Sequence, residues 1–189
     1  SFGGPSPAYQ PGHAHCDGLA FELSVEGERV VTDTGVYEYV DGGRRHQARM
    51  TRAHATLEVG GEEQAEIWSG HRVGGRPEVA LVEWVPGVAV EARCAGWATA
   101  KSVHHRRVEV DGGDLVVTDR LAGSPAAVQA TLPLAPGSQL SLLGARAEVR
   151  LSSGALLRIE LPRELEWKIR EAPYFPTFGC EVLRPALIG

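Results

Sequence analysis

The chain has little lysine and little cysteine, and each shortage argues against a class of protein. Only two of its nineteen basic residues are lysines, Lys101 and Lys168, and the net charge is −5. An acidic balance of this kind argues against binding to a nucleic-acid backbone. The three cysteines are an odd number and form no C-x-x-C pair. Neither a cysteine-based zinc site nor a disulfide framework is therefore indicated.

Long apolar segments are also missing. No run approaches the ~20 apolar residues that a membrane span needs, and no basic-then-apolar leader opens the chain, so no membrane partner is expected. No stretch carries apolar residues at helical spacing over a useful length. The chain does not begin with Met, so we expect a mature product or a piece of something longer. Its 189 residues, 43% of them hydrophobic, suffice for one compact domain.

Apolar and polar residues instead alternate along much of the chain, a period of two that is typical of half-buried strands. The 23 glycines and 12 prolines divide these stretches into short pieces. The predicted hairpins and strands are 19–33, turning at Gly27; 79–94, turning at Pro86-Gly87; 105–119, turning at 111–114; 147–161, turning at 152–154; and single strands at 53–59 and 127–132. We predict an all-β fold, an antiparallel two-sheet β-sandwich built of consecutive hairpins.

The organisation along the chain is simple. Residues 1–12 are rich in Gly, Pro and Ser and are predicted to be a connector from an absent upstream domain. No internal repeat or linker divides the remainder, so the sandwich is expected to occupy residues 13–189.

Histidines are the most informative residues of this sequence. His13 and His15 form an H-x-H, which in extended backbone places both rings on one face. Asp33 ends the first predicted hairpin, and His54 begins the next strand. Two imidazoles and one carboxylate suit Zn²⁺ with a fourth position left for water. The spacing alone leaves ordinary surface or core histidines as the alternative.

Strand register limits how such a site can form. If Val25 pairs with Arg29, Asp33 faces Phe21 and lies roughly 20 Å along the ladder from His15. A site that joins His15 and Asp33 therefore requires the chain to fold back at Asp17-Gly18. Gly18 supplies a permissive backbone at that point.

Four ordered segments carry a resemblance to a known family. They are Gly12-His13-Ala14-His15-Cys16-Asp17 with Phe21-Glu22-Leu23, then Asp33-Thr34-Gly35-Val36-Tyr37, then Arg44 to Thr56, and finally Tyr174-Phe175-Pro176-Thr177-Phe178-Gly179. Together they resemble the G-H-x-H-x-D…F-x-L, D-x-G-x-Y, R-R…A-H-N-T and Y-x-P-x-[FY]-G motifs of the heparinase II/III-like polysaccharide lyases. The match spans most of the chain.

The resemblance implies a C-terminal β-sandwich that normally follows an (α/α) toroid, which this chain lacks. Family members cleave uronic-acid polysaccharides by β-elimination and are expected to be periplasmic or secreted. The resemblance assigns the catalytic His to His13 and a structural zinc, one per chain, to His15, Asp33 and His54. The toroid supplies a tyrosine for proton transfer and a residue that neutralises the substrate carboxylate. The isolated chain is therefore expected to be inactive.

One residue departs from the family pattern. Ala55 stands where the family usually has Asn directly after the zinc His, which puts the choice of substrate in question but leaves the ligands in place.

Arginines and the remaining histidines receive simpler interpretations. Arg45 and Arg49, with Arg44, are candidates for binding uronate or sulfate groups of an acidic polysaccharide through their forked donors. Tyr37 and Tyr39 are expected to pack as aromatics. His104 and His105 are adjacent and must point to opposite faces of a strand, whereas His46 and His71 are expected to be exposed.

Two other functional classes compete with a lyase module. His15, Asp17 and His54 formally satisfy the H-x-D…H pattern of a non-haem iron oxygenase, which would use Asp17 in place of Asp33. A non-catalytic carbohydrate-binding or scaffolding sandwich is the second alternative. The identity of the bound metal, zinc or iron, and the carboxylate that binds it, Asp33 or Asp17, distinguish the lyase from the oxygenase interpretation.

Overall fold

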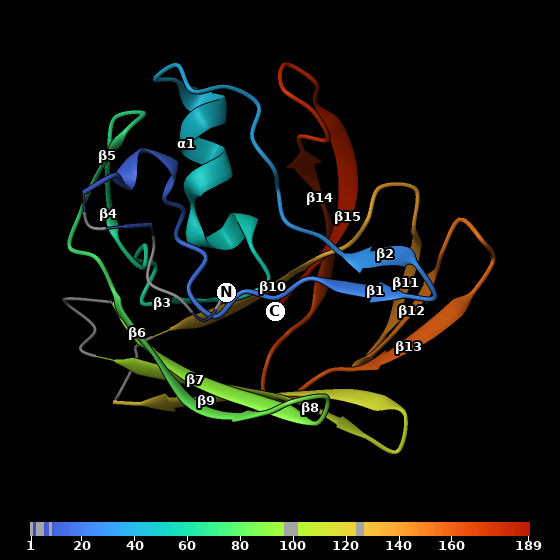
Figure 1. The fold of residues 1–189 in the computed structure, drawn as a ribbon. Helices are drawn as coiled ribbons and strands as arrows, with labels where there is room; N and C mark the ends of the chain where they lie inside the picture. Colours follow the sequence, from blue (N-terminus) through green and yellow to red (C-terminus); the bar gives the residue numbers. More distant parts are fainter. Residues whose placement is uncertain (1, 3–5, 8, 97–101, 124–126) are drawn as a thin grey trace.

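The computed structural model describes residues 2, 6–7, 9–96, 102–123 and 127–189 (Figure 1). Strands dominate this part of the chain, and its helices are short. In chain order the elements are η1 (Pro11–His13), β1 (Leu23–Val25), β2 (Glu28–Val31), α1 (Gly43–Arg49), η2 (Thr51–Ala53), β3 (Leu57–Val59), β4 (Glu66–Trp68), β5 (Arg72–Gly74), β6 (Glu78–Val85), β7 (Ala89–Ala95), β8 (Val103–Asp111), β9 (Asp114–Ala122), β10 (Val128–Pro133), β11 (Gln139–Leu143), β12 (Arg146–Arg150), β13 (Leu156–Glu160), β14 (Lys168–Tyr174) and β15 (Val182–Ile188). Within the described ranges, no helix has the length and apolar character that crossing a membrane requires.

The described strands pair antiparallel in five sheets. Two sheets have four strands each, in the orders β14-β15-β10-β3 and β6-β7-β8-β9, and a third has the order β11-β12-β13. The hairpins β1–β2 and β4–β5 complete the set. The prediction of an all-β antiparallel fold is confirmed, although the strands divide into more sheets than the two expected.

Three predicted hairpins lie where the turn signals place them, as β6–β7, β8–β9 and β12–β13. The first hairpin is shorter than expected, because only β1 and β2 are strands within 19–33. Its predicted register holds at Leu23, which pairs with Val31. An irregularity after Leu23 then shifts the tip, so that Val25 pairs with Glu28 and not with Arg29.

One of three hydrophobic clusters in the described part of the chain lies between the two four-stranded sheets. Leu57 and Val59 of β3 pack with Ala92 and Cys94 of β7, and Leu19 joins them from the chain before β1. In Figure 1 the β6–β9 sheet lies on one side of β3 and β10, and α1 lies on the other side. The short helices η1 and η2 and the β4–β5 hairpin gather around α1, where η1 contacts β5 and α1 contacts η2.

The apolar pattern did not predict helix α1, nor the strands β4, β5, β11, β14 and β15. The buried residues of α1 are Arg45, Ala48 and Arg49, which have the i, i+3, i+4 spacing of one helical face. Two of these three are arginines, so the buried face carries no apolar periodicity. A hydrophobicity pattern therefore cannot detect it.

Candidate metal centre and the surface around His13

A sharp turn returns the chain toward the core after the H-x-H segment. The amide of Ala20 donates to the carbonyl of Asp17 at 2.9 Å, which closes a turn over residues 17–20. The predicted fold-back at Asp17-Gly18 is thus confirmed. The fold-back does not depend on a permissive backbone at Gly18, as the sequence suggested. The residue in the left-handed conformation is Leu19, with a φ of 61°.

Gly18 is needed for space. A Cβ at this position would lie 2.9 Å from Sγ of Cys94 and 2.9 Å from Oε1 of Gln64. Gln64 is fully buried, and its side chain makes two hydrogen bonds with the backbone of Gly18. Oε1 accepts from the Gly18 amide at 2.7 Å, and Nε2 donates to the Gly18 carbonyl at 3.1 Å. Thr56 donates to the same carbonyl at 2.8 Å. The sequence analysis missed Gln64, since its role depends on contacts 46 residues apart in the chain.

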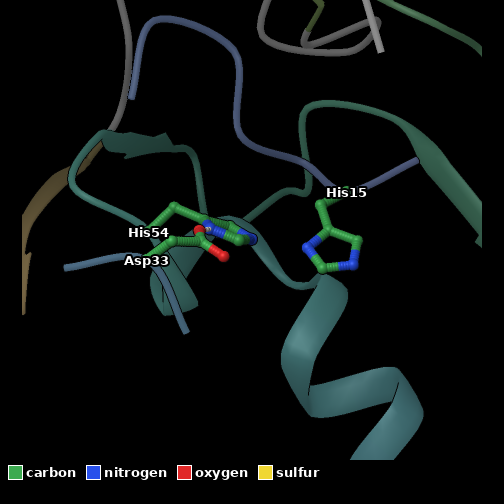
Figure 2. Close-up of side chains that lie close together, drawn as sticks. All are labelled: His15, Asp33 and His54. Atoms are coloured by element: carbon green, nitrogen blue, oxygen red, sulfur yellow. Dashed lines mark hydrogen bonds and ion pairs between the residues drawn. The ribbon is translucent and has the colours of Figure 1, made fainter. Parts of the chain in front are cut away.

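The fold-back brings His15, Asp33 and His54 together (Figure 2). One ligand atom from each of the three lies within 4.8 Å of the others. His54, which follows η2 and does not open a strand as predicted, directs Nδ1 to Oδ1 of Asp33 at 2.6 Å. The second oxygen of Asp33 accepts from the Gly35 amide at 3.0 Å. The three residues that the sequence proposed as metal ligands are therefore neighbours.

The atoms that face each other suit a divalent metal ion. Nε2 of His54 is buried and has no hydrogen-bond partner among the described residues. A buried, unpaired ring nitrogen beside a second imidazole and a carboxylate is the donor set that Zn²⁺ prefers.

The surroundings of this cluster favour a neutral imidazole at His15 and an ionised carboxylate at Asp33. Burial, together with the neighbouring His54, lowers the pKa of His15 to about 3. Burial alone would raise the pKa of Asp33, but the hydrogen bonds from His54 and from the Gly35 amide outweigh it and hold that pKa below its usual range. Both groups are thus in the protonation state that metal binding requires.

Asp17 does not belong to this cluster. Among the described residues, the one group of three or more His, Cys, Asp or Glu side chains close enough to hold a metal is His15, Asp33 and His54. The oxygenase interpretation required Asp17 to lie with His15 and His54, and the structure does not bring it there. The geometric basis of that alternative is therefore lost.

Arg45 and Arg49 were predicted to bind substrate, and the structure shows both of them buried. Their exposed fractions are 1% and 0%. Arg45 donates to the carbonyl of Gly12 at 2.6 Å, and Arg49 donates to the carbonyl of Ala14 at 2.8 Å. Buried guanidiniums that hydrogen-bond main-chain carbonyls do not face a ligand in solvent. Both arginines instead hold the backbone on either side of His13.

Arg45 also contacts His15. Its Nη1 lies 3.3 Å from Nε2 of His15. Arg44 is exposed, as a substrate-binding residue would be, but it pairs with Glu181 at 2.6 Å.

His13 lies on the exposed side of the same segment, beside a group of aromatic rings. Its Nδ1 is 3.2 Å from the hydroxyl of Tyr39, and the two rings meet edge to face with centroids 5.0 Å apart. The Tyr39 ring also lies 5.7 Å from that of Phe178 and 6.4 Å from that of His71. Tyr37 packs on Phe175 as expected, whereas Tyr39 contacts a candidate catalytic group. His71 and His46 are exposed, in agreement with their prediction.

A second buried histidine lies away from this site. His104 is fully buried and His105 is partly exposed, as their opposite faces require. Nε2 of His104 is 2.6 Å from Asp119, which also accepts from Arg106 at 2.7 and 2.8 Å. Arg106 in turn donates to the carbonyl of Ala55, the residue that follows His54. This network was not predicted, although Arg106 and Asp119 are opposite each other in the 105–119 hairpin that the sequence indicated.

Comparison with known families identifies the family of this strand-rich module. The chain belongs to the heparinase II/III-like, C-terminal family, whose model matches residues 2–188. No curated protein sequence matches the chain.

Solved structures have the same fold. A heparinase III gene product superposes with a TM-score of 0.76 at 17% identity, covering 93% of this chain and 28% of that one. The heparan sulfate lyase HepC from Pedobacter heparinus superposes with a TM-score of 0.71 at 21% identity, again over 93% and 28%. This chain thus spans little more than a quarter of the length of these neighbours.

Proposed function

We propose that this chain is the C-terminal module of a polysaccharide lyase that cleaves uronic-acid-containing polysaccharide by β-elimination. His13 is the proton-transfer group, and His15, Asp33 and His54 hold one structural zinc ion. Residues 1–12 are the connector from an upstream (α/α) toroid, and residues 13–189 are the sandwich. The full-length protein acts in the periplasm or outside the cell.

One observation carries this proposal: the two histidines of the H-x-H have different surroundings. His15 points into a partly buried cluster with Asp33 and His54, while His13 is exposed beside Tyr39. Arg49 fixes the carbonyl of Ala14 between them. A ligand and a proton-transfer group are thus presented two residues apart by one rigid segment.

The chemistry explains why an exposed imidazole is needed. Elimination removes the proton at C5 of the uronate, forms the C4–C5 double bond and breaks the bond from C4 to the glycosidic oxygen, which leaves with a proton. An imidazole can accept or donate a proton near neutral pH, and Tyr39 holds the His13 ring in place from its Nδ1 side. Neutralisation of the substrate carboxylate, which makes the C5 proton acidic enough to remove, is assigned to the upstream domain. When bound, the zinc ion would fix the segment that carries both histidines.

Paired alanine variants in the full-length protein test the proposal. His13→Ala should keep zinc and melting temperature but lower turnover by roughly 10² to 10⁴, the usual range for loss of a positioned acid or base. His15→Ala should lose zinc and the stability that zinc contributes. His46→Ala, an exposed histidine on α1, is the matched control and should behave as wild type.

Zinc content, thermal unfolding and formation of unsaturated uronate are measured on each variant. Equal zinc loss in the His13 and His15 variants would make His13 a ligand and would withdraw its catalytic role. Full turnover in His13→Ala would also withdraw the catalytic role of His13.

A further inference from the structure

Arg184 lies in the middle of β15, and its guanidinium is buried on the inner side of the sheet. Its exposed fraction is 1%. No carboxylate among the described residues lies within ion-pair distance of it, and its nearest aromatic contact is the ring of Tyr174, 5.3 Å from the guanidinium carbon. Burial lowers the pKa of Arg184 to about 10, so the group is still charged at neutral pH. A buried charge without an ion-pair partner is costly unless hydrogen bonds compensate it.

The compensating acceptors all come from two short segments. Nη1 donates to the carbonyl and hydroxyl of Thr32, both at 2.6 Å, and to the carbonyl of Asp33 at 2.8 Å. Nη2 donates to the hydroxyl of Thr34 at 2.5 Å and to the carbonyl of Ala53 at 3.3 Å. One planar group therefore holds residues 32–34 against residue 53.

These two segments carry two of the three candidate metal ligands. Asp33 lies inside the first segment, and His54 directly follows the second. Thr34 strengthens the link, because its hydroxyl also donates to the carbonyl of Ala53 at 2.5 Å. The distance between the Asp33 and His54 backbones is thus set by a residue about 130 positions further along the chain.

We propose that Arg184 is a positioning residue of the metal centre, which holds Asp33 and His54 at the separation that metal binding requires. This inference rests on the zinc site of the proposed function. A merely structural arginine would spread its donors over the core, whereas the donors of Arg184 that are paired reach only the segments that carry ligands. Removal of Arg184 should therefore change the affinity of the site more than it changes the fold.

Zinc affinity of the 189-residue chain, measured by competition with a chromophoric chelator, provides the test. Arg184→Lys keeps the charge but lacks the planar fork that reaches both segments. We expect it to weaken zinc binding by roughly 10- to 100-fold, the range found when outer groups that orient metal ligands are lost. The visible absorption spectrum of the Co²⁺-loaded variant should also change, because it reports the arrangement of the ligands.

Two further variants keep the test decisive. Thr34→Val retains the side-chain volume but removes the hydroxyl shared by Arg184 and Ala53, and we expect a smaller loss of affinity, roughly threefold to tenfold. Leu187→Ala, in the same strand but in a separate part of the core, is the control for general destabilisation. It should lower the melting temperature and leave zinc affinity below that temperature unchanged.

The possible outcomes separate the two proposals. A wild-type chain that binds no zinc overturns the metal site itself. A wild-type chain that binds zinc, with Arg184→Lys and Thr34→Val within twofold of its affinity, overturns only the role of Arg184. Equal loss of affinity in Leu187→Ala also overturns it, since the effect would then be one of global stability. If Arg184→Lys does not fold, the result for Thr34→Val decides.

Discussion

Substitution of Gly18 by alanine tests the close approach on which the fold-back depends. The added Cβ would lie 2.9 Å from Sγ of Cys94 and from Oε1 of Gln64, both shorter than a normal contact. Gln64 cannot move away easily, because it is buried and hydrogen-bonded to the amide and carbonyl of Gly18. Overpacking of this kind costs about 1–3 kcal/mol, and the strained hydrogen bond adds about 1 kcal/mol. We therefore expect Gly18→Ala to lower the free energy of unfolding by about 2–4 kcal/mol.

Equilibrium urea unfolding measures this loss, with Gly43→Ala as the control. A Cβ at Gly43, the first residue of α1, meets nothing within 4 Å, so that variant should differ from wild type by less than about 1 kcal/mol. Because the fold-back brings His15 to Asp33, Gly18→Ala should also weaken zinc binding.

A double-mutant cycle identifies the cause. Cys94→Ala removes the Sγ atom that the new methyl group would meet, so the penalty of Gly18→Ala should be smaller in that background. An equal penalty in both backgrounds, or a Gly18→Ala variant within about 0.5 kcal/mol of wild type, would refute the argument from close approach.

Two other predictions concern buried charge. The metal-free chain should lose stability as the pH falls from about 6.5 toward 3. Burial lowers the pKa of His15 to about 3 and also lowers the pKa of His104. Over this pH range the unfolded chain therefore takes up protons that the folded chain does not. Urea unfolding at several pH values should show a slope of up to about 1.4 kcal/mol per pH unit for each histidine, and a flat profile would contradict it. By the same assay, Asp119→Ala should lower the free energy of unfolding by about 3–5 kcal/mol, because His104 and Arg106 would lose their shared acceptor. Glu160→Ala removes an exposed ion pair and should cost under about 1 kcal/mol. Similar losses in the two variants would contradict this prediction.

Local sequence signals were enough to predict much of the sheet structure. The glycine- and aspartate-rich turn at 111–114 placed the β8–β9 hairpin, and alternation placed the strands on either side of it. The register argument assumed that Val25 pairs with Arg29, which is wrong at the tip of the hairpin. Its register holds at Leu23, and its conclusion that His15 reaches Asp33 through a fold-back is confirmed. Where chain geometry is set by neighbouring residues, the prediction succeeded.

The failures share a physical cause. Arg45 and Arg49 looked like surface residues because arginine is rarely fully buried, yet they form the inner face of α1. Gln64 and Arg184 gave no signal, since their partners are far away in sequence and are mostly main-chain atoms. Residue type alone cannot predict a side chain that binds a distant carbonyl.

The position of Arg184 near the end of the chain has a consequence for biosynthesis. His15, Asp33 and His54 all precede β3 in the chain, so they leave the ribosome well before β15 does. The hydrogen bonds that join Thr32, Asp33 and Ala53 to Arg184 cannot form until that strand has emerged and paired with β10 and β14. The ligand cluster therefore reaches its final form only after β15 has emerged, and a protein truncated before β15 would keep every ligand and still lack the assembled site.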